Sequence, residues 1–193
     1  MLSAHQGCPF LRIDTIEQTI RNLCAIKVEG EGCRMAYRIA SNHLSIGNSV
    51  VAGSCNPIAL TRLAWHDVAS KAGARAVNVE VICSGPVEHQ KRVETRSAEV
   101  TGLALPTWQE VMNREHHPWN SDRIVIDTAG SNAAQSFAEL QHKLSQQHIQ
   151  QAVQASGHDL FYSHGVTHRA MPAPFGLNWV LVRSQRVIWF SYR

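Results

Sequence analysis

The sequence is poor in long apolar segments. No apolar run approaches the roughly 18 residues of a membrane-spanning helix, and the chain opens without the basic and then apolar residues of a signal peptide. Charge of one sign is also scarce, because 18 basic and 15 acidic residues leave a formal charge of +3. The basic residues are spread along the chain, which argues against nucleic-acid binding. We therefore expect a soluble, cytoplasmic protein without a membrane partner.

Paired cysteine motifs are absent as well. The sequence has no CxxC spacing, and its five cysteines are Cys8, Cys24, Cys33, Cys55 and Cys83. Because free thiols in apolar runs behave as small hydrophobic side chains, we expect reduced, buried cysteines rather than disulfides or zinc ligands. With 44% hydrophobic and 17% charged residues, the 193-residue chain has the composition of an ordinary globular domain, which excludes fibrous and disordered classes.

Short β-favouring runs alternate with segments of helical periodicity. Strands are expected at 8–13, 49–52, 77–82 and 123–127, and helices at 15–24, 34–46, 58–71, 86–96, 107–115 and 133–148. Parallel strands need crossover connections, which are usually helices. The expected fold is therefore α/β, a three-layer arrangement of a parallel sheet with helices on both faces. Ligands in such folds bind beyond the carboxyl ends of the strands. Those positions are Asp14, 53–56, 83–85 and 127–128.

Five sequence motifs follow one another between residues 11 and 130. They are LRIDTIEQTIR (11–21), SVVAGSCNPIALTRLAW (49–65), VEVICSGPVEHQKRVETR (79–96), LPTWQEVMNREHHPW (105–119) and RIVIDTAG (123–130). In this order they resemble the AAA-like P-loop kinases of bacteria, the branch of chloramphenicol phosphotransferase, gluconate kinase and polynucleotide kinase. The resemblance covers about residues 8–144. It implies a P-loop NTPase-like domain over 1–150 with a lid at about 97–119, and phosphoryl transfer from ATP with Mg²⁺ to a small-molecule hydroxyl.

The resemblance implies catalytic roles for Asp14, Arg92 and Arg96. Asp14 would accept the proton of the substrate hydroxyl as it attacks the γ-phosphate. A helix cap is the alternative for this residue. Arg92 and Arg96 lie one helical turn apart, so both would reach the transferring phosphoryl group. The alternative for them is a solvated helix on which Glu88 and Glu94 are their ion-pair partners.

Further residues are implied in binding. Arg12, Arg21 and Asn56 would contact the substrate, and for the two arginines the alternative is pairing with carboxylates at the protein surface. Asp127 and Thr128 match the place where relatives pass close to the adenine and ribose of the nucleotide. An aspartate at the end of a strand is also a common turn residue.

The sequence departs from this family at its main phosphate-binding groups. The loop G-x-x-x-x-G-K-[ST] is absent, because none of Lys27, Lys71, Lys91 and Lys143 follows a glycine. Gly53 stands where relatives commonly have an acidic residue. These losses remove most of the groups that neutralise charge in phosphoryl transfer. We expect little or no kinase activity, and a non-catalytic binding or regulatory remnant of such a kinase is the alternative.

The resemblance also implies a gap in the sheet. The family's first strand is missing, and in the family it lies between the strands that correspond to Val50 and Val79. Either the sheet closes, another segment fills the gap, or the chain folds poorly. A C-terminal extension, 151–193, contains a β-prone hairpin at 177–190 that we expect to pack on or extend the sheet. A non-homologous tail is the alternative. Its histidines lack a zinc motif, so no metal site is predicted.

Overall fold

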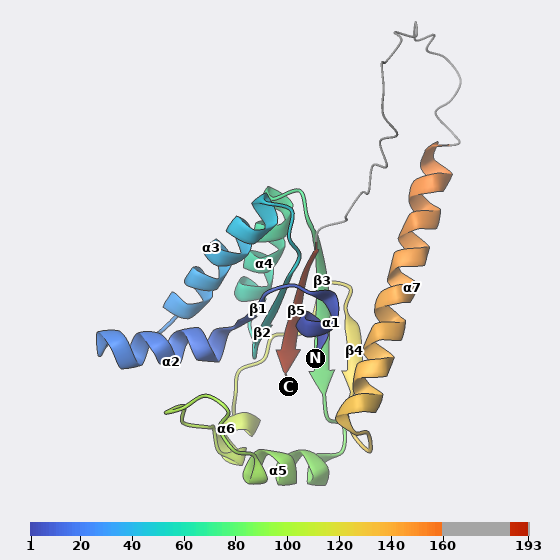
Figure 1. The fold of residues 1–193 in the computed structure, drawn as a ribbon. Helices are drawn as coiled ribbons and strands as arrows, with labels where there is room; N and C mark the ends of the chain where they lie inside the picture. Colours follow the sequence, from blue (N-terminus) through green and yellow to red (C-terminus); the bar gives the residue numbers. More distant parts are fainter. Residues whose placement is uncertain (160–185, 193) are drawn as a thin grey trace, which may run out of the picture.

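The computed structural model describes residues 1–159 and 186–192, which form an α/β fold around a parallel sheet (Figure 1). The sheet has five strands in the order β1-β2-β5-β3-β4, and every neighbouring pair is parallel. The expected strands are present, and a fifth lies near the end of the chain. The strands are β1 (Phe10–Arg12), β2 (Val50–Ser54), β3 (Arg75–Ile82), β4 (Ile124–Asp127) and β5 (Arg186–Tyr192).

Helices occupy all of the expected positions. They are α2 (Ile13–Cys24), α3 (Glu31–Ser45), α4 (Ala59–Lys71), α5 (Pro86–Thr95), α6 (Trp108–Met112) and α7 (Ala133–Asp159). A further short helix, α1 (Leu2–Gln6), was not expected, because five residues are too few to show a helical period. The helix α6 is shorter than expected, and it begins at a capping box in which Thr107 and Glu110 exchange hydrogen bonds.

Helices pack on both faces of the sheet. Along β2 the side chains of Val50 and Ala52 join one hydrophobic cluster, whereas Val51 joins another, because successive residues of a strand point to opposite faces. The first cluster contains Leu44 of α3 and the almost fully buried Trp65 of α4. The second cluster contains residues of α1 and α7. The sheet is therefore the middle layer between two groups of helices (Figure 1).

The strand β5 fills the place where the sequence predicted a gap. Its backbone pairs with β2 over Val50–Ser54 and with β3 over Arg75–Val81. Ile188 lies opposite Val51 on one side and Val77 on the other, and its side chain is fully buried. An open gap would leave backbone donors and acceptors of β2 and β3 unpaired. The strand β5 forms hydrogen bonds with both of these strands.

The C-terminal segment thus enters the sheet interior and does not extend its edge. Of the predicted hairpin at 177–190, the first arm lies outside the described residues, and the second arm is part of β5. The helix α7 runs through residue 150, the expected domain boundary, and ends at Asp159. The strand β5, although it lies beyond the expected domain boundary, therefore belongs to the same sheet as β1 to β4.

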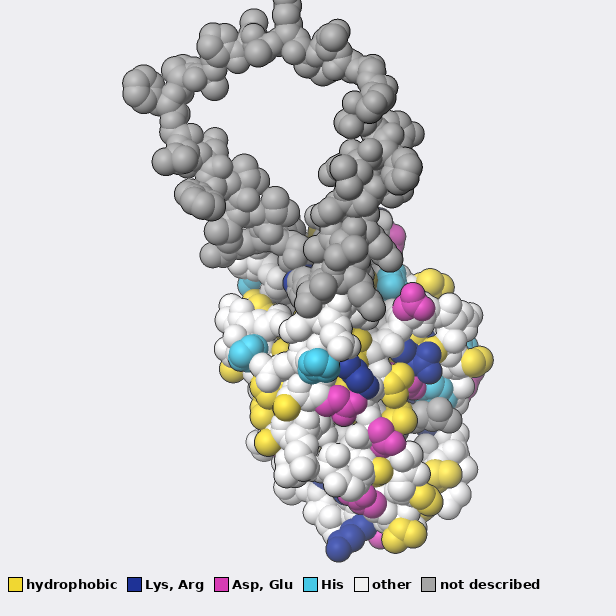
Figure 2. All heavy atoms as spheres, turned by 90° about the vertical axis from the view of Figure 1, so that its right-hand side faces the viewer, with side chains coloured by type: hydrophobic (Ala, Val, Ile, Leu, Met, Phe, Trp, Pro, Cys, Tyr) yellow, Lys and Arg dark blue, Asp and Glu magenta, His cyan; other side chains and the backbone are white. Residues whose placement is uncertain are grey.

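The helices, the charged surface and the cysteines can be compared with the predictions on membrane, nucleic acid and thiol burial. Within the described residues, no helix has the length and apolarity needed to cross a membrane. On the face seen in Figure 2, basic and acidic side chains of the described residues are interspersed and form no continuous basic surface. All five cysteines are free, but Cys24 is exposed at the end of α2 and the others are only half-buried. Burial raises the pKa of Cys33 to about 11, so this thiol stays protonated near neutral pH.

Candidate functional site

The helices α5 and α6 lie beyond the carboxyl ends of the strands (Figure 1). Two cavities are found in this region. The larger has a volume of about 640 Å³ and extends from the ends of β1 and β2 to the loop after α5. The smaller, of about 330 Å³, adjoins the end of β3. They share His89, Val111 and Arg114 in their walls, so they lie side by side. This is the edge at which the sequence predicted a ligand site.

Asp14 lines the larger cavity. The helix α2 begins at Ile13 after the extended Arg12, which places Asp14 in the first helical turn. A carboxylate there is favoured by the helix dipole. The N-cap residue of α2 is Arg12, so Asp14 does not form the cap that was predicted as its alternative role. The Nε of Arg12 lies 4.0 Å from Oδ2 of Asp14, and the carboxylate remains 45% exposed, so it is accessible to a ligand.

Arg12 also lines the larger cavity and contacts the loop after α5. Its Nη1 donates to Oε2 of Glu99 at 2.5 Å. The alternative prediction, pairing with carboxylates at the protein surface, therefore describes Arg12 as it stands. Arg21 is likewise paired, since its Nη2 donates to Oε2 of Glu17 at 3.1 Å, and it lines neither cavity.

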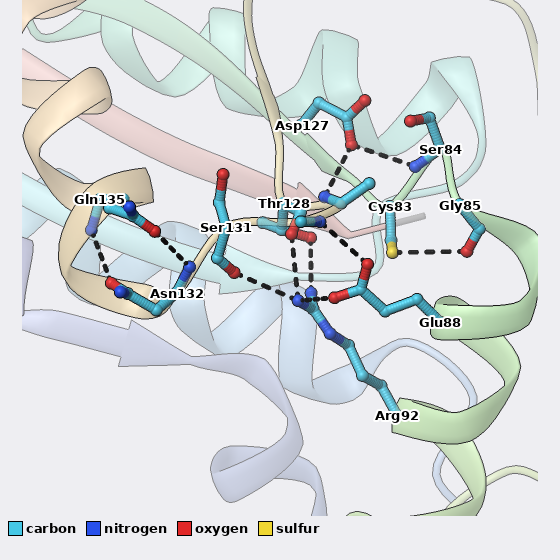
Figure 3. A network of polar contacts seen from close by, with 12 residues as sticks. Cys83, Ser84, Gly85, Glu88, Arg92, Asp127, Thr128, Ser131, Asn132 and Gln135 are labelled. Carbon is cyan, nitrogen blue, oxygen red and sulfur yellow. Dashed lines mark hydrogen bonds and ion pairs between the residues drawn. The ribbon is translucent and has the colours of Figure 1, made fainter.

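Arg92 and Arg96 do not converge on one point. Arg92 donates to Oγ1 of Thr128 at 2.9 Å and to the carbonyl oxygens of Thr128 and Ser131, and it forms an ion pair with Glu88 (Figure 3). Arg96 instead lines the larger cavity and donates to the carbonyl oxygen of Pro106 at 3.2 Å. The helix α5 ends at Thr95, and Arg96 has an extended backbone, so the expected one-turn spacing does not apply.

Asp127 and Thr128 join the ends of β3 and β4 and line neither cavity. Oδ1 of Asp127 accepts hydrogen bonds from the backbone amides of Ser84 and Ala129, both at 3.0 Å (Figure 3). The backbone and hydroxyl of Thr128 both donate to the carbonyl oxygen of Ile82 at 2.8 Å. Asp127 therefore acts here as the turn residue that was the alternative prediction.

These hydrogen bonds give Asp127 a role in stability that depends on pH. Bonds from Ser84 and Ala129 lower the pKa of its carboxyl group. Its stabilising effect is therefore complete above the unfolded pKa of about 3.9 and is lost as pH falls through the lower folded pKa. We expect Asp127→Asn to lower the melting temperature at pH 7 and to narrow the difference in melting temperature between pH 7 and about pH 3.

Thermal melts of both proteins at the two pH values test this expectation. Asp67→Asn is a matched control, because Asp67 pairs with Lys71 on the exposed side of α4. An unchanged difference between the two pH values in Asp127→Asn would contradict the assigned role.

In the sequence, Asn56 lies between a residue of the larger cavity and a residue of the smaller one. It follows Cys55, which lines the larger cavity, and precedes Pro57, which lines the smaller. Its side chain is only 2% exposed and its φ angle is +41°, a left-handed conformation that asparagine tolerates better than most residues. No partner for the buried Nδ2 is found among the described residues. The predicted substrate contact is thus close to the site but not in its wall.

The structure adds residues that sequence reasoning did not select. His89 lines both cavities and packs edge-on against Trp108, with ring centroids 5.1 Å apart. Burial, followed by the charges of Arg96 and Arg92, lowers the pKa of His89, so the imidazole is neutral at pH 7. Arg114 also lines both cavities. Its place within the expected lid was the signal in the sequence, and in the structure it follows the end of α6 at Met112.

His117, in the loop after α6, contacts α4. Its Nδ1 accepts a hydrogen bond from the backbone amide of Ala59 at 3.1 Å, at the first residue of that helix. First-turn amides of a helix lack partners within the helix, and His117 satisfies one of them. The loop after α6 is thereby attached to the β2–α4 connection.

The cavity walls combine guanidinium groups, carboxylates and a neutral imidazole. Within residues 1–159 and 186–192, no group of three or more histidine, cysteine, aspartate or glutamate residues is placed to hold a metal ion. Comparisons with protein-family models, with curated proteins and with solved structures gave no match. The kinase resemblance therefore rests on the ordered motifs alone. The site itself is an arginine-rich cavity at the edge of a parallel sheet, with the carboxylates of Asp14 and Glu99 in its wall.

Proposed function

We propose that the chain is a kinase-like domain of the P-loop NTPase type, which binds ATP with Mg²⁺ and holds a small-molecule hydroxyl beside Asp14. One observation carries the proposal: Asp14 lies at the carboxyl edge of a parallel sheet, in the wall of a cavity of about 640 Å³. In phosphoryl transfer a carboxylate so placed accepts the hydroxyl proton. Arg96 in the same wall supplies positive charge for the phosphoryl group.

The strand order supports this proposal. The kinases that the sequence resembles have a central strand between the two that correspond to β2 and β3, and β5 lies between those strands. The proposal assigns to β5 the structural place of that strand, which completes a three-layer P-loop-like arrangement. Free cysteines fit the proposed cytoplasmic location, where thiols are kept reduced.

The side chains in the cavity wall determine how well this site could bind Mg²⁺ and support phosphoryl transfer. Mg²⁺ in such sites is held by one or two carboxylates together with the phosphates of the nucleotide, and Asp14 and Glu99 are the carboxylates in the wall of the larger cavity. The sequence has no lysine that follows a glycine, and Gly53 offers the cavity no carboxylate. Loss of one preorganised electrostatic group typically costs a factor of about 10² to 10³ in rate. Transfer by this chain alone should therefore be close to background.

Calorimetric titration of the purified protein with MgATP, together with a thermal melt, tests the proposal. We expect saturable binding by a cooperatively melting protein, and transfer to hydroxyl acceptors near background. Acceptor binding should weaken by about tenfold in Asp14→Asn, since a hydrogen bond to a carboxylate is lost. Asp67→Asn, on the exposed face of α4, is the matched control and should bind acceptors normally.

A second candidate is a non-catalytic binding or regulatory domain on the same scaffold. It is favoured by the missing phosphate-binding loop and by Gly53. Nucleotide binding separates the two candidates. A folded protein that ignores MgATP and still binds a small molecule in the cavity would overturn the kinase proposal and support this one.

A further inference from the structure

An ion pair joins the two sides of the larger cavity. Arg12 comes from the end of β1 and Glu99 from the loop after α5, 87 residues away in sequence, and both line the cavity. The side chain of Glu99 is 77% exposed, whereas that of Arg12 is 32% exposed. The ion pair therefore joins a largely exposed carboxylate on the loop to a half-buried guanidinium group at the edge of the sheet.

The charges around this pair favour a negative ligand. Arg12, Arg96 and Arg114 line the larger cavity together with the carboxylates of Asp14 and Glu99, so three positive groups face two negative ones. The acceptor of Arg96 is a neutral carbonyl oxygen, that of Pro106. Among residues 1–159 and 186–192, no hydrogen bond from the Arg114 guanidinium group is found, and its charge interacts with the carboxyl group of Glu110 without an ion pair at contact distance. Among the described residues, Arg12 is thus the one arginine of this cavity with a carboxylate at hydrogen-bond distance, and that carboxylate belongs to Glu99.

We propose that this cavity takes small molecules that carry an acid group, a carboxylate or a phosphate, as well as a hydroxyl. The acid group of the ligand replaces Glu99 on Arg12 and frees the loop at 97–106. This inference rests on the proposed function, because that function places the hydroxyl of the same molecule beside Asp14. It adds the substrate class and identifies Glu99 as an internal competitor of the substrate.

Energetics make such an exchange feasible. An ion pair with an exposed partner contributes little net stability, because both groups are well solvated when apart. A bidentate contact between arginine and a carboxylate or phosphate is stronger. Arg96 and Arg114 lie in the same wall to add to it. The exchange therefore replaces a weak contact within the chain with several contacts to the ligand.

Calorimetric titration of the full chain with glycerate, glycerol 3-phosphate and glycerol tests the substrate class. We expect the two acids to bind and glycerol, which has the hydroxyls without the acid, to bind more weakly or not at all. The stronger of the two acids identifies carboxylate or phosphate as the preferred group. Equal binding of glycerol and both acids, or binding of none, would overturn the inference. The outcome of the MgATP titration does not depend on this result, so it tests the kinase proposal separately.

Variants test the role of Glu99. In Glu99→Gln we expect both acids to bind about two- to fivefold more tightly, the range that an exposed ion pair allows. Glu94→Gln makes the same change of charge on α5, where Glu94 accepts from Gln90, and should leave binding unchanged. Arg12→Gln should weaken the acids by at least about tenfold, and Arg12→Lys should restore part of the affinity. Equal affinities in wild type and Glu99→Gln would overturn the role of Glu99.

Amide hydrogen exchange separates a released loop from a simple change of charge. In Glu99→Gln, and in the wild type saturated with the tighter acid, amides of residues 97–106 should exchange faster than in the free wild type. Unchanged or slower exchange on saturation would contradict the release of the loop.

Discussion

Replacement of Ile188 with aspartate is expected to abolish cooperative thermal unfolding of the protein. Ile188 is fully buried in β5, between Val51 of β2 and Val77 of β3. Truncation of a buried isoleucine to alanine already costs about 2 to 5 kcal/mol. A charged carboxylate adds a desolvation cost of several kcal/mol. The sum is comparable with the total stability of a domain of this size, which is about 5 to 15 kcal/mol.

Circular dichroism melts measure this effect. Leu60→Asp is the control, because Leu60 is 72% exposed on α4, and its free energy of unfolding should change by less than about 0.5 kcal/mol. Ile188→Val, a milder change, should cost about 0.5 to 1.5 kcal/mol. A wild-type melting curve for Ile188→Asp would show that β5 does not occupy the centre of the sheet.

The second large effect is expected at Glu80 of β3. Its side chain is almost fully buried, and its Oε2 accepts from Nε of Arg123 at 2.5 Å. The guanidinium groups of Arg123 and Arg62 both lie over the Trp119 ring, 5.3 and 4.5 Å from its centroid. Replacement of Glu80 with leucine leaves these two positive charges without their buried carboxylate. We expect a loss of about 3 to 5 kcal/mol in the free energy of unfolding.

Urea denaturation of a double variant distinguishes loss of the carboxylate from a packing defect. Glu80→Leu combined with Arg123→Leu removes both members of the pair, so part of the lost stability should return. If the double variant is less stable than Glu80→Leu by the full cost of Arg123→Leu alone, the two side chains are not coupled. The explanation by a lone buried charge would then be wrong.

Local patterns were sufficient for most of the secondary structure. The helix α4 was expected at 58–71 and is observed at Ala59–Lys71. Its bounds were predictable because the apolar periodicity and the following Gly73 are local signals within one short segment. The expected strand at 77–82 lies within β3, which begins two residues earlier. The position of β5 was not predictable in this way, since strand pairing between residues 51 and 188 depends on contacts far apart in sequence.

The candidate site was predicted only in part. Asp14, Arg12 and Arg96 line one cavity because each lies at or next to the end of a helix or strand whose boundary was predicted nearly correctly. The position of Arg92 was not predicted correctly, because its guanidinium group binds Thr128, which follows β4 and is 36 residues away in sequence. The pairing of Arg12 with Glu99 depends on the path of the loop after α5, and no local period encodes that path.

The central position of β5 has a consequence for how the chain folds during its synthesis. Ribosomes deliver β1 to β4 first, yet β2 and β3 have no direct pairing and must wait for residues 186–192 to lie between them. Until then a nascent chain presents two unpaired strand edges to its surroundings. Contacts of such long range also slow folding. The sheet should therefore be completed only after residues 186–192 have been synthesised, and folding should be sensitive to chaperones that shield exposed strands.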